Sequence, residues 1–376
     1  MKPVKFFIPL FCVFLVYLFL AGPVGAQDHP LDGWKTNVEK RSIELDELIS
    51  GGPPKDGIPS IDQPVYIPAG EAARWLGDRE PVISVRIDDE ARAYPLQILM
   101  WHEITNTRFG EVPAAVTFCP LCYSALVFDR RVDGETLEFG VSGFLRHSDM
   151  IMYDRTTESL WQQITGEAVV GTYTGTRLKP LSSQIISFEQ FREIYPDGSV
   201  LSRETGHQRA YGRNPYVGYD NIDQSPMFID PSDVDGRLRP MQKVIGVVIG
   251  DRQKVYPYEL TRESGAINDV FAGREILVLH TGGAASAMDA PRIEQSKEAG
   301  STGVYFRQVN GRTLRFSLEN GNIVDRETGS TWDISGRAID GPLEGTRLEA
   351  VTSGDYFAFA WLVFYPDSAI YGSNTD

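Results

Sequence analysis

The sequence has little positive charge and few residues that could act as thiols or soft-metal ligands. Lysine and arginine number 36, aspartate and glutamate 51, and the net charge at pH 7 is −15. Such an acidic surface disfavours nucleic acid and anionic membranes as partners. Only three cysteines and five histidines occur in 376 residues. Thiol chemistry or metal binding through cysteine and histidine is therefore limited to a few positions in this chain.

Sequence signals for several common enzyme chemistries are also absent. The chain has no glycine-rich phosphate loop, no nucleophile elbow and no His-Glu-x-x-His motif. The familiar signals for hydrolysis are therefore missing, and no nucleotide cofactor is expected. Beyond residues 1–26 no apolar run suggests a membrane span, which needs about 20 residues. The sequence leaves open whether the protein is an enzyme.

The N-terminus has the layout of a signal peptide. Lys2 and Lys5 precede an apolar run over residues 6–21, and Ala26 is one of the small residues expected before a cleavage point. This layout predicts removal of residues 1–26 and export to a bacterial periplasm or out of the cell. An uncleaved N-terminal anchor is the alternative, although the run is short for a membrane span.

Two long stretches of the sequence match each other at a nearly constant offset. The segment from Asp154 to Trp161 recurs 171 positions later, from Asp325 to Trp332. Further pairs match at offsets of 170 or 162: Gly166 with Gly336, Gly171 with Gly341, Tyr195-Pro196 with Tyr365-Pro366, Tyr94-Pro95 with Tyr256-Pro257, and Asn106 with Asn268. A few loop insertions would account for the changes of offset. The pattern predicts that an ancestral unit was duplicated.

The duplication predicts how the exported chain is organised. Residues 27–80 are a loop-rich lead-in, residues 81–201 the first unit, residues 202–242 an aromatic-rich linker and residues 243–376 the second unit. The linker has too many aromatic residues to be a free tether, so we expect it to pack across the junction of the units. Hydrophobic residues make up 42% of the chain, which is ample for a core.

Apolar residues recur mostly with a period of two, which is typical of strands. The predicted elements are strands at residues 82–87, 114–118, 124–128, 244–249 and 276–280, two-residue hairpin turns at Asp133-Gly134 and Asn310-Gly311, and short helices around residues 43–48, 96–102 and 188–195. The predicted fold class is therefore α+β, mainly β, with two tandem homologous units and a few short helices in each.

Several motifs resemble those of a known prokaryotic family. They are Val116 to Cys122, Gly140 to Gly143, Met152 to Arg155, Glu158 to Gln163, and Tyr211 to Tyr216. The family is the one catalogued as domain of unknown function 3179, and the resemblance extends over most of the exported chain. It implies no assigned activity, so the chemistry must be argued from the residues.

Comparison of the two units indicates which residues are candidates for chemistry. Residues that both units keep are interpreted as scaffold, and residues that one unit alone carries as functional candidates. At an offset of 162, the first unit has Cys119, Cys122 and His102 where the second has Thr281, Ala284 and Ser264. Both thiols of the exported chain are therefore confined to the first unit.

Cys119 and Cys122 form a Cys-x-x-Cys motif between two predicted strands. In thioredoxin-like proteins the first cysteine starts a helix, whose partial charge lowers the thiol pKa, and no helix is predicted here. A tight turn between strands is instead typical of a metal knuckle. A redox-active disulfide is one alternative, because an oxidising compartment favours pairing. A structural disulfide is another, although so short a loop gains little stability from it.

Two histidines and a methionine are the other candidate ligands. His102 is the leading partner of the thiols, with a packed histidine bonded to backbone as its alternative interpretation. His147 and Met150 form a second group with Met152, and the two methionines face the same side of a predicted strand. Core filling is the alternative for the methionines. Thioether with thiolate suits copper(I), and cysteine with histidine suits zinc.

The sequence thus predicts an exported protein that binds copper or zinc, or performs thiol redox chemistry, through Cys119 and Cys122. The alternative is a non-catalytic binding scaffold of the cell envelope, in which these cysteines form a structural disulfide. The sequence identifies no substrate and no protein or small-molecule partner.

Overall fold

The computed structural model describes residues 31–373, so the predicted signal peptide lies outside the described residues. Residues 31–34 fall in one unit and residues 35–373 in a second, which contains all the helices and strands of the described residues. Within residues 31–373, no helix is both long enough and apolar enough to cross a membrane.

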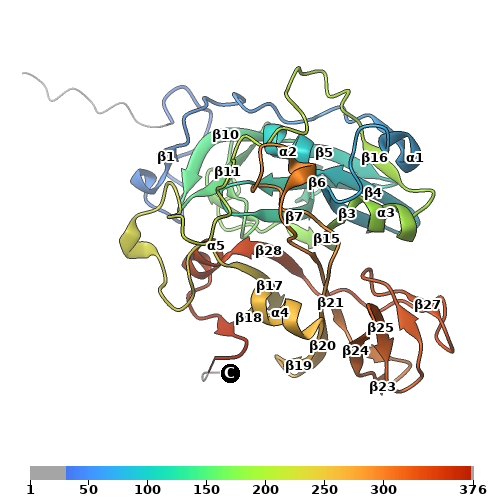
Figure 1. The fold of residues 1–376 in the computed structure, drawn as a ribbon. Coiled ribbons are helices and arrows are strands. Elements are labelled where there is room, and N and C mark those ends of the chain that lie inside the picture. Colours follow the sequence, from blue (N-terminus) through green and yellow to red (C-terminus); the bar gives the residue numbers. More distant parts are fainter. Residues whose placement is uncertain (1–30, 374–376) are drawn as a thin grey trace, which may run out of the picture. The chain divides into compact units, whose positions relative to one another are not determined.

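The second of these units is mainly β, as the sequence predicts, with several open sheets and few helices (Figure 1). Its N-terminal part contains η1 (Leu45–Glu47), β1 (Ile49–Ser50), β2 (Tyr66–Pro68) and α1 (Ala69–Ala72). A first half then follows with β3 (Pro81–Ile87), β4 (Glu90–Pro95), α2 (Leu96–His102), β5 (Ile104–Phe109), β6 (Val112–Cys119), β7 (Ser124–Asp129), β8 (Arg131–Val132), β9 (Glu135–Thr136), β10 (Phe139–Arg146), β11 (Asp149–Asp154), β12 (Leu160–Gln162), β13 (Glu167–Val170), β14 (Lys179–Leu181), β15 (Ser183–Ser187), α3 (Phe188–Ile194) and β16 (Ser199–Leu201).

The remainder of the chain contains the other elements. They are η2 (Pro231–Asp233), β17 (Lys243–Ile249), β18 (Arg252–Pro257), α4 (Tyr258–Ser264), β19 (Ala266–Phe271), β20 (Arg274–Thr281), η3 (Ile293–Gln295), β21 (Ser301–Phe306), β22 (Gln308–Val309), β23 (Arg312–Thr313), β24 (Phe316–Glu319), β25 (Asn322–Asp325), β26 (Thr331–Trp332), β27 (Ala338–Asp340), β28 (Ser353–Phe357), α5 (Ala358–Phe364) and β29 (Ala369–Ile370).

Three strand orders of the first half occur again in the second half. The order β15-β3-β4-β16 has its counterpart in β28-β17-β18-β29, and β10-β11-β12-β13 in β24-β25-β26-β27. The order β7-β6-β5 has its counterpart in β21-β20-β19. In the first of these pairs the last strand is parallel to its neighbour in both halves. At the junction of the halves, β15 lies beside β21 and β28 (Figure 1).

Local sequence signals explain the turns and the helices. Asp133 and Gly134 have φ angles of 50° and 86°, and Asn310 and Gly311 have 51° and 77°, as a two-residue hairpin turn requires. Helix α3 begins after Ser187 with a capping box and ends shortly before a proline. The predicted helices at 96–102 and 188–195 are confirmed as α2 and α3, whereas the one around 43–48 is a single 3-10 turn.

A buried aspartate organises the same turn in each half. Asp154 accepts hydrogen bonds from the backbone of Thr157 and, at 3.1 Å, from the indole Nε1–H of Trp161. Asp325 accepts the corresponding bonds from Thr328 and, at 3.0 Å, from Trp332. Both carboxylates are fully buried, so these bonds satisfy groups that water does not reach.

The segment between the two halves, residues 202–242, is almost entirely irregular and is tied to both of them. The hydroxyl of Tyr219 donates to the carbonyl of Leu121 at 3.3 Å. On the other side, the Asn214 side chain donates to the carbonyl of Ala290 at 3.1 Å. The segment is therefore packed rather than free.

Candidate metal centre

The two cysteines lie at the ends of a tight turn between β6 and β7, as the sequence predicts. The N–H of Cys122 donates to the carbonyl of Cys119 at 3.3 Å, and that of Tyr123 to Pro120 at 3.2 Å. Tyr123 has a φ of 56°, a conformation that residues with a Cβ rarely adopt. Both cysteines are free and buried. The turn thus holds two thiols side by side in the protein interior.

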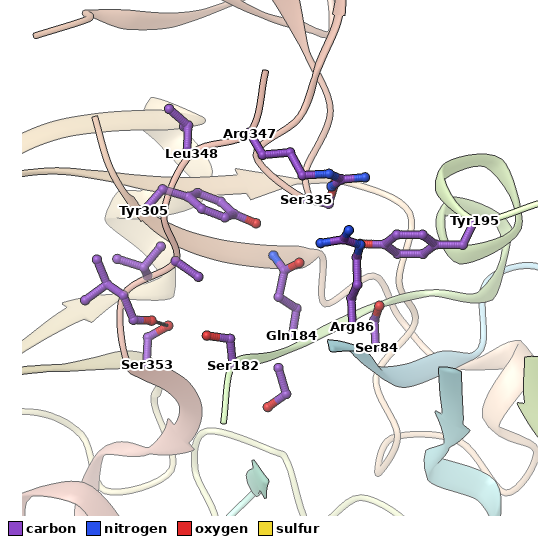
Figure 2. Close-up of a pocket in the computed structure, with 14 residues that line it drawn as sticks. Ser84, Arg86, Ser182, Gln184, Tyr195, Tyr305, Ser335, Arg347, Leu348 and Ser353 are labelled. Atoms are coloured by element: carbon purple, nitrogen blue, oxygen red, sulfur yellow. Dashed lines mark hydrogen bonds between the residues drawn. The ribbon is translucent and has the colours of Figure 1, made fainter. Parts of the chain in front are cut away.

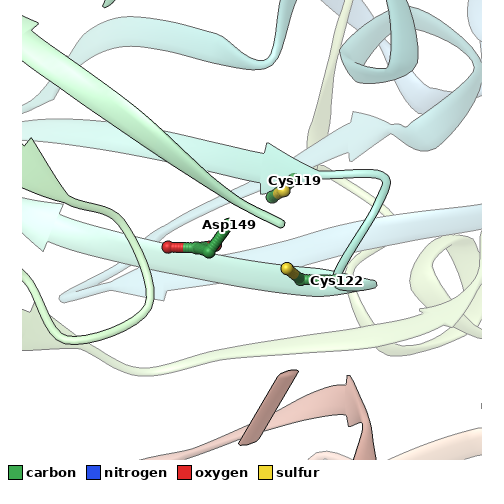
Figure 3. Close-up of side chains that lie close together, drawn as sticks. All are labelled: Cys119, Cys122 and Asp149. Carbon is green, nitrogen blue, oxygen red and sulfur yellow. The ribbon is translucent and has the colours of Figure 1, made fainter. Parts of the chain in front are cut away.

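Asp149 is the third member of the group. Within residues 31–373, Cys119, Cys122 and Asp149 form the one set of three or more cysteine, histidine or acidic residues whose ligand atoms all lie within 4.8 Å of one another. The three side chains come from the β6–β7 turn and from the start of β11 (Figure 3). Segments 30 residues apart in sequence therefore meet at the thiols.

One carboxylate oxygen of Asp149 lacks a hydrogen bond. Its Oδ2 accepts from Gln162 Nε2 at 2.6 Å and from the N–H of Ile164 at 2.9 Å. Its Oδ1 is buried and has no hydrogen bond of ordinary length, although the Cys122 thiol and the Met150 N–H approach the carboxylate closely enough to lower its pKa against the larger effect of burial. An unsatisfied buried acceptor costs about 1–3 kcal/mol, so its presence beside two thiols needs an explanation. A metal ion bound to this oxygen would provide one, and the chemistry of the three side chains fits such an ion.

Glu103 is a second buried acid beside this group. It caps the C-terminus of α2 with a φ of 57°, where the second half has Gly265 with a φ of 66°. Glycine adopts this conformation without strain, whereas an ordinary residue does so at a cost of about 1–3 kcal/mol. The Glu103 side chain lines a cavity of about 160 Å³ together with Leu121 and Met150. The first half thus keeps a strained acid in place of a glycine next to the thiols.

Burial and neighbouring acids dominate the electrostatics of the group. Burial raises the pKa of Asp149 to about 6 and, with the charge of Asp149, that of Glu103 to about 8. Burial also raises the pKa of Cys119, and that of Cys122 well above its usual range. The largest influences on these four pKa values are burial, hydrogen bonds and neighbouring acids and thiols, with no cation among them. A reactive thiol needs a lowered pKa, so the surroundings disfavour thioredoxin-like chemistry.

The structure does not bring His102 to the thiols, which corrects the leading ligand of the sequence interpretation. Its Nδ1 lies 2.7 Å from the carbonyl of Pro59 and its Nε2 lies 2.6 Å from the hydroxyl of Tyr211. Because a carbonyl can only accept, Nδ1 carries the proton and Nε2 accepts from Tyr211. Both ring nitrogens are occupied, and the ring is fully buried. The packed histidine, which was the alternative interpretation, describes it.

His147 and Met150 lie in different surroundings. His147 Nδ1 is 3.3 Å from Asp233 and its Nε2 is 3.8 Å from Glu47, and its ring contacts Phe364. No nitrogen of His147 belongs to the group of the thiols. Met150 is buried and lines the cavity beside Glu103, so of the two it is the one that lies near the candidate centre.

The acid stability of the protein should report on His102. Burial lowers its pKa from 6.5 to about 4. The unfolded chain therefore binds a proton between these pH values that the folded chain does not, so stability falls as the pH drops from 6.5 to 4. His102→Gln is expected to reduce the slope by at most about 1.4 kcal/mol per pH unit. Urea unfolding at several pH values measures this, and equal slopes in parent and variant would contradict it.

Fold and site define a class, a mainly β protein of open sheets with a buried group of two thiols and a carboxylate. The family model described as "Protein of unknown function (DUF3179)" matches residues 55–368, and the chain belongs to this family. The resemblance seen in the sequence motifs is thereby confirmed. No curated protein and no solved structure matches the chain.

Proposed function

We propose that the protein is exported and binds one zinc ion through Cys119, Cys122 and Asp149. The observation that carries the proposal is Asp149 Oδ1, a buried oxygen with no hydrogen bond of ordinary length, in a group whose ligand atoms lie within 4.8 Å of one another. With Zn–S bonds of about 2.3 Å and Zn–O bonds of about 2.0–2.2 Å, the two sulfurs and the oxygen on a tetrahedral ion lie roughly 3.5 to 3.8 Å apart. Small side-chain movements would close the difference.

Charge and ligand chemistry favour zinc. The two thiols, whose pKa values are raised, would each give up a proton on binding, and a divalent cation balances the charge of the two thiolates. A carboxylate with two thiolates suits zinc better than copper(I), which prefers sulfur ligands. Met150 at the cavity beside Glu103 is the one feature that favours copper. Copper is therefore the second candidate ion.

Three protein ligands leave a fourth position on a tetrahedral ion. Structural zinc sites are usually closed by four protein ligands, whereas sites that bind or activate a small molecule keep one position open. A cavity lined by Glu103, Leu121 and Met150, which are neighbours of the proposed ligands in sequence or in space, has room for a water molecule or a small ligand, although none of the three ligands lines it. Glu103, with its raised pKa, could hold or give up a proton at that place. The arrangement thus supports a binding or catalytic site more than a purely structural one.

The proposal includes the duplication of an ancestral unit, with the centre confined to the first copy. The repeated strand orders and the repeated Asp–Trp turn support the duplication. Hairpin β10–β11 extends beyond the length of β24–β25, which already turns at Asn320 and Gly321. Asp149 lies on this extension. The second copy thus lacks both the thiols and the segment that supplies the carboxylate.

Metal analysis of the purified exported protein tests the proposal. We expect about one zinc per chain after loading and dialysis, and at least tenfold weaker binding in Asp149→Asn. His102→Gln should bind zinc as the parent does, because both of its ring nitrogens are engaged elsewhere. Zinc binding that survives in Asp149→Asn and fails in His102→Gln would contradict the proposed ligand set. If the protein retains copper(I) in preference to zinc, the identity of the ion in the proposal is wrong, and the ligand set remains supported.

A further inference from the structure

A second cavity, of about 280 Å³, lies between the two halves, and the side chains that line it carry positive charge. It is lined from the first half by β3, β15 and the residues beside them, and from the second by β21, β28 and the segment from 335 to 351. Its lining includes Arg86, Arg347 and five serines, and no aspartate or glutamate. In a chain with a net charge of −15, a cavity with two arginines and no acid is unusual.

Arg347 has lost the acidic partner that its counterpart keeps. In the first half, Arg177 lies opposite Glu167 across an antiparallel bridge and forms an ion pair with it at 2.6 Å. At the offset of 170, the second half has Arg347 opposite Arg337 across the corresponding bridge. Like charges directly opposite each other across two strands destabilise the pair. Arg337 thus stands where the first half has Glu167, and the like charges of Arg337 and Arg347 reduce stability.

Arg86 approaches the same space from the first half. Figure 2 shows the guanidinium groups of Arg86 and Arg347 directed toward one region, with the hydroxyl of Tyr195 and the amide of Gln184 close by. The ion pair of Arg86 is with Asp89 at 3.5 Å, and the Asp89 side chain is fully exposed. An exposed pair of this kind contributes little. Neither guanidinium is therefore neutralised by a buried carboxylate.

We propose that this cavity binds a small hydroxylated anion, such as a sugar acid or a sugar phosphate. Guanidinium groups bind carboxylate and phosphate oxygens in forked, charge-assisted pairs. The serine hydroxyls and Tyr195 can donate to and accept from ligand hydroxyls. The volume is at the small end of ligand sites, which suits a molecule of monosaccharide size. The cavity shares no lining residue with the candidate metal centre, so the two proposals stand independently.

Calorimetric titration of the purified protein with three probes tests the inference. Glucuronate and glucose 6-phosphate are expected to bind, and uncharged glucose at least tenfold more weakly. Binding of one anion alone identifies whether a carboxylate or a phosphate is preferred, and binding of both shows that the shared charge decides. Equal affinity for glucose and the anions, or no binding of either anion at millimolar concentration, would overturn the proposal.

Variants assign the binding to the cavity. Arg86→Gln and Arg347→Gln should each weaken anion binding at least tenfold, whereas Arg177→Gln, the counterpart in the first half, should leave it unchanged. Arg337→Glu restores the acid that the first half carries at this place and should weaken binding as well. Circular dichroism checks that each variant is folded. Parent-like affinity in both cavity variants would place the anion elsewhere and refute the assignment.

Discussion

Replacing both cysteines, Cys119→Ser with Cys122→Ser, is expected to abolish the stabilisation that the proposed zinc ion would give to the protein. A ligand that binds only the folded state adds about 4.1 kcal/mol when its concentration is a thousand times its dissociation constant. The parent should therefore melt at a clearly higher temperature with zinc than with a chelator. The double variant should melt at the same temperature in both.

The metal-free double variant should nevertheless fold. The second half has Thr281 and Ala284 at the corresponding positions, and its β20 and β21 still pair. Thr281→Ser with Ala284→Ser is the matched control, and its zinc-dependent stabilisation should equal that of the parent. An equal gain from zinc in the cysteine double variant and the parent would contradict the proposed centre.

Replacing Asp154 by alanine is expected to destabilise the fold by about 3 to 5 kcal/mol, because buried groups lose their charged acceptor. The N–H of Ser159 and the indole N–H of Trp161, both fully buried, bond to this carboxylate. Chemical unfolding measures the loss. Asp325→Ala should cost a similar amount, since Trp332 bonds to Asp325 in the same way.

Glu111→Ala is the control for these aspartate variants. Its side chain is fully exposed, and its ion pair with Arg108 spans 4.0 Å. Surface substitutions of this kind usually change stability by less than about 0.5 kcal/mol. If Asp154→Ala were as mild as Glu111→Ala, the buried aspartate would not organise the turn as described. If only one of the two aspartates mattered, the two halves would differ in how their cores are held.

The part of the secondary structure that could be predicted from the sequence is the part that local chemistry decides. The buried strands β6 and β20, the helices α2 and α3 and the two hairpin turns each follow from a short pattern of apolar residues, caps or positive-φ residues. The short distance between Cys119 and Cys122 could be predicted for the same reason, since a turn of four residues holds them.

The rest of the candidate centre depends on contacts that a local pattern does not contain. Asp149 reaches the thiols because β10 and β11 extend past the end of the corresponding hairpin, and His102 is held by Pro59 and Tyr211 from distant segments. One signal was present in the sequence. Glu103 stands opposite Gly265 at the offset of 162, and an acid with positive φ where the other half has a glycine is the kind of strained position that is common at functional sites.

X-ray absorption at the zinc edge of the loaded protein tests the central claim most directly. The proposed centre predicts a first shell with two sulfur atoms at about 2.3 Å and oxygen atoms at about 2.0–2.2 Å. In Asp149→Asn the two sulfurs should remain while the oxygen shell changes. A first shell without sulfur, or one with two sulfurs and imidazole nitrogens, would contradict the assignment of Cys119, Cys122 and Asp149 as the metal ligands.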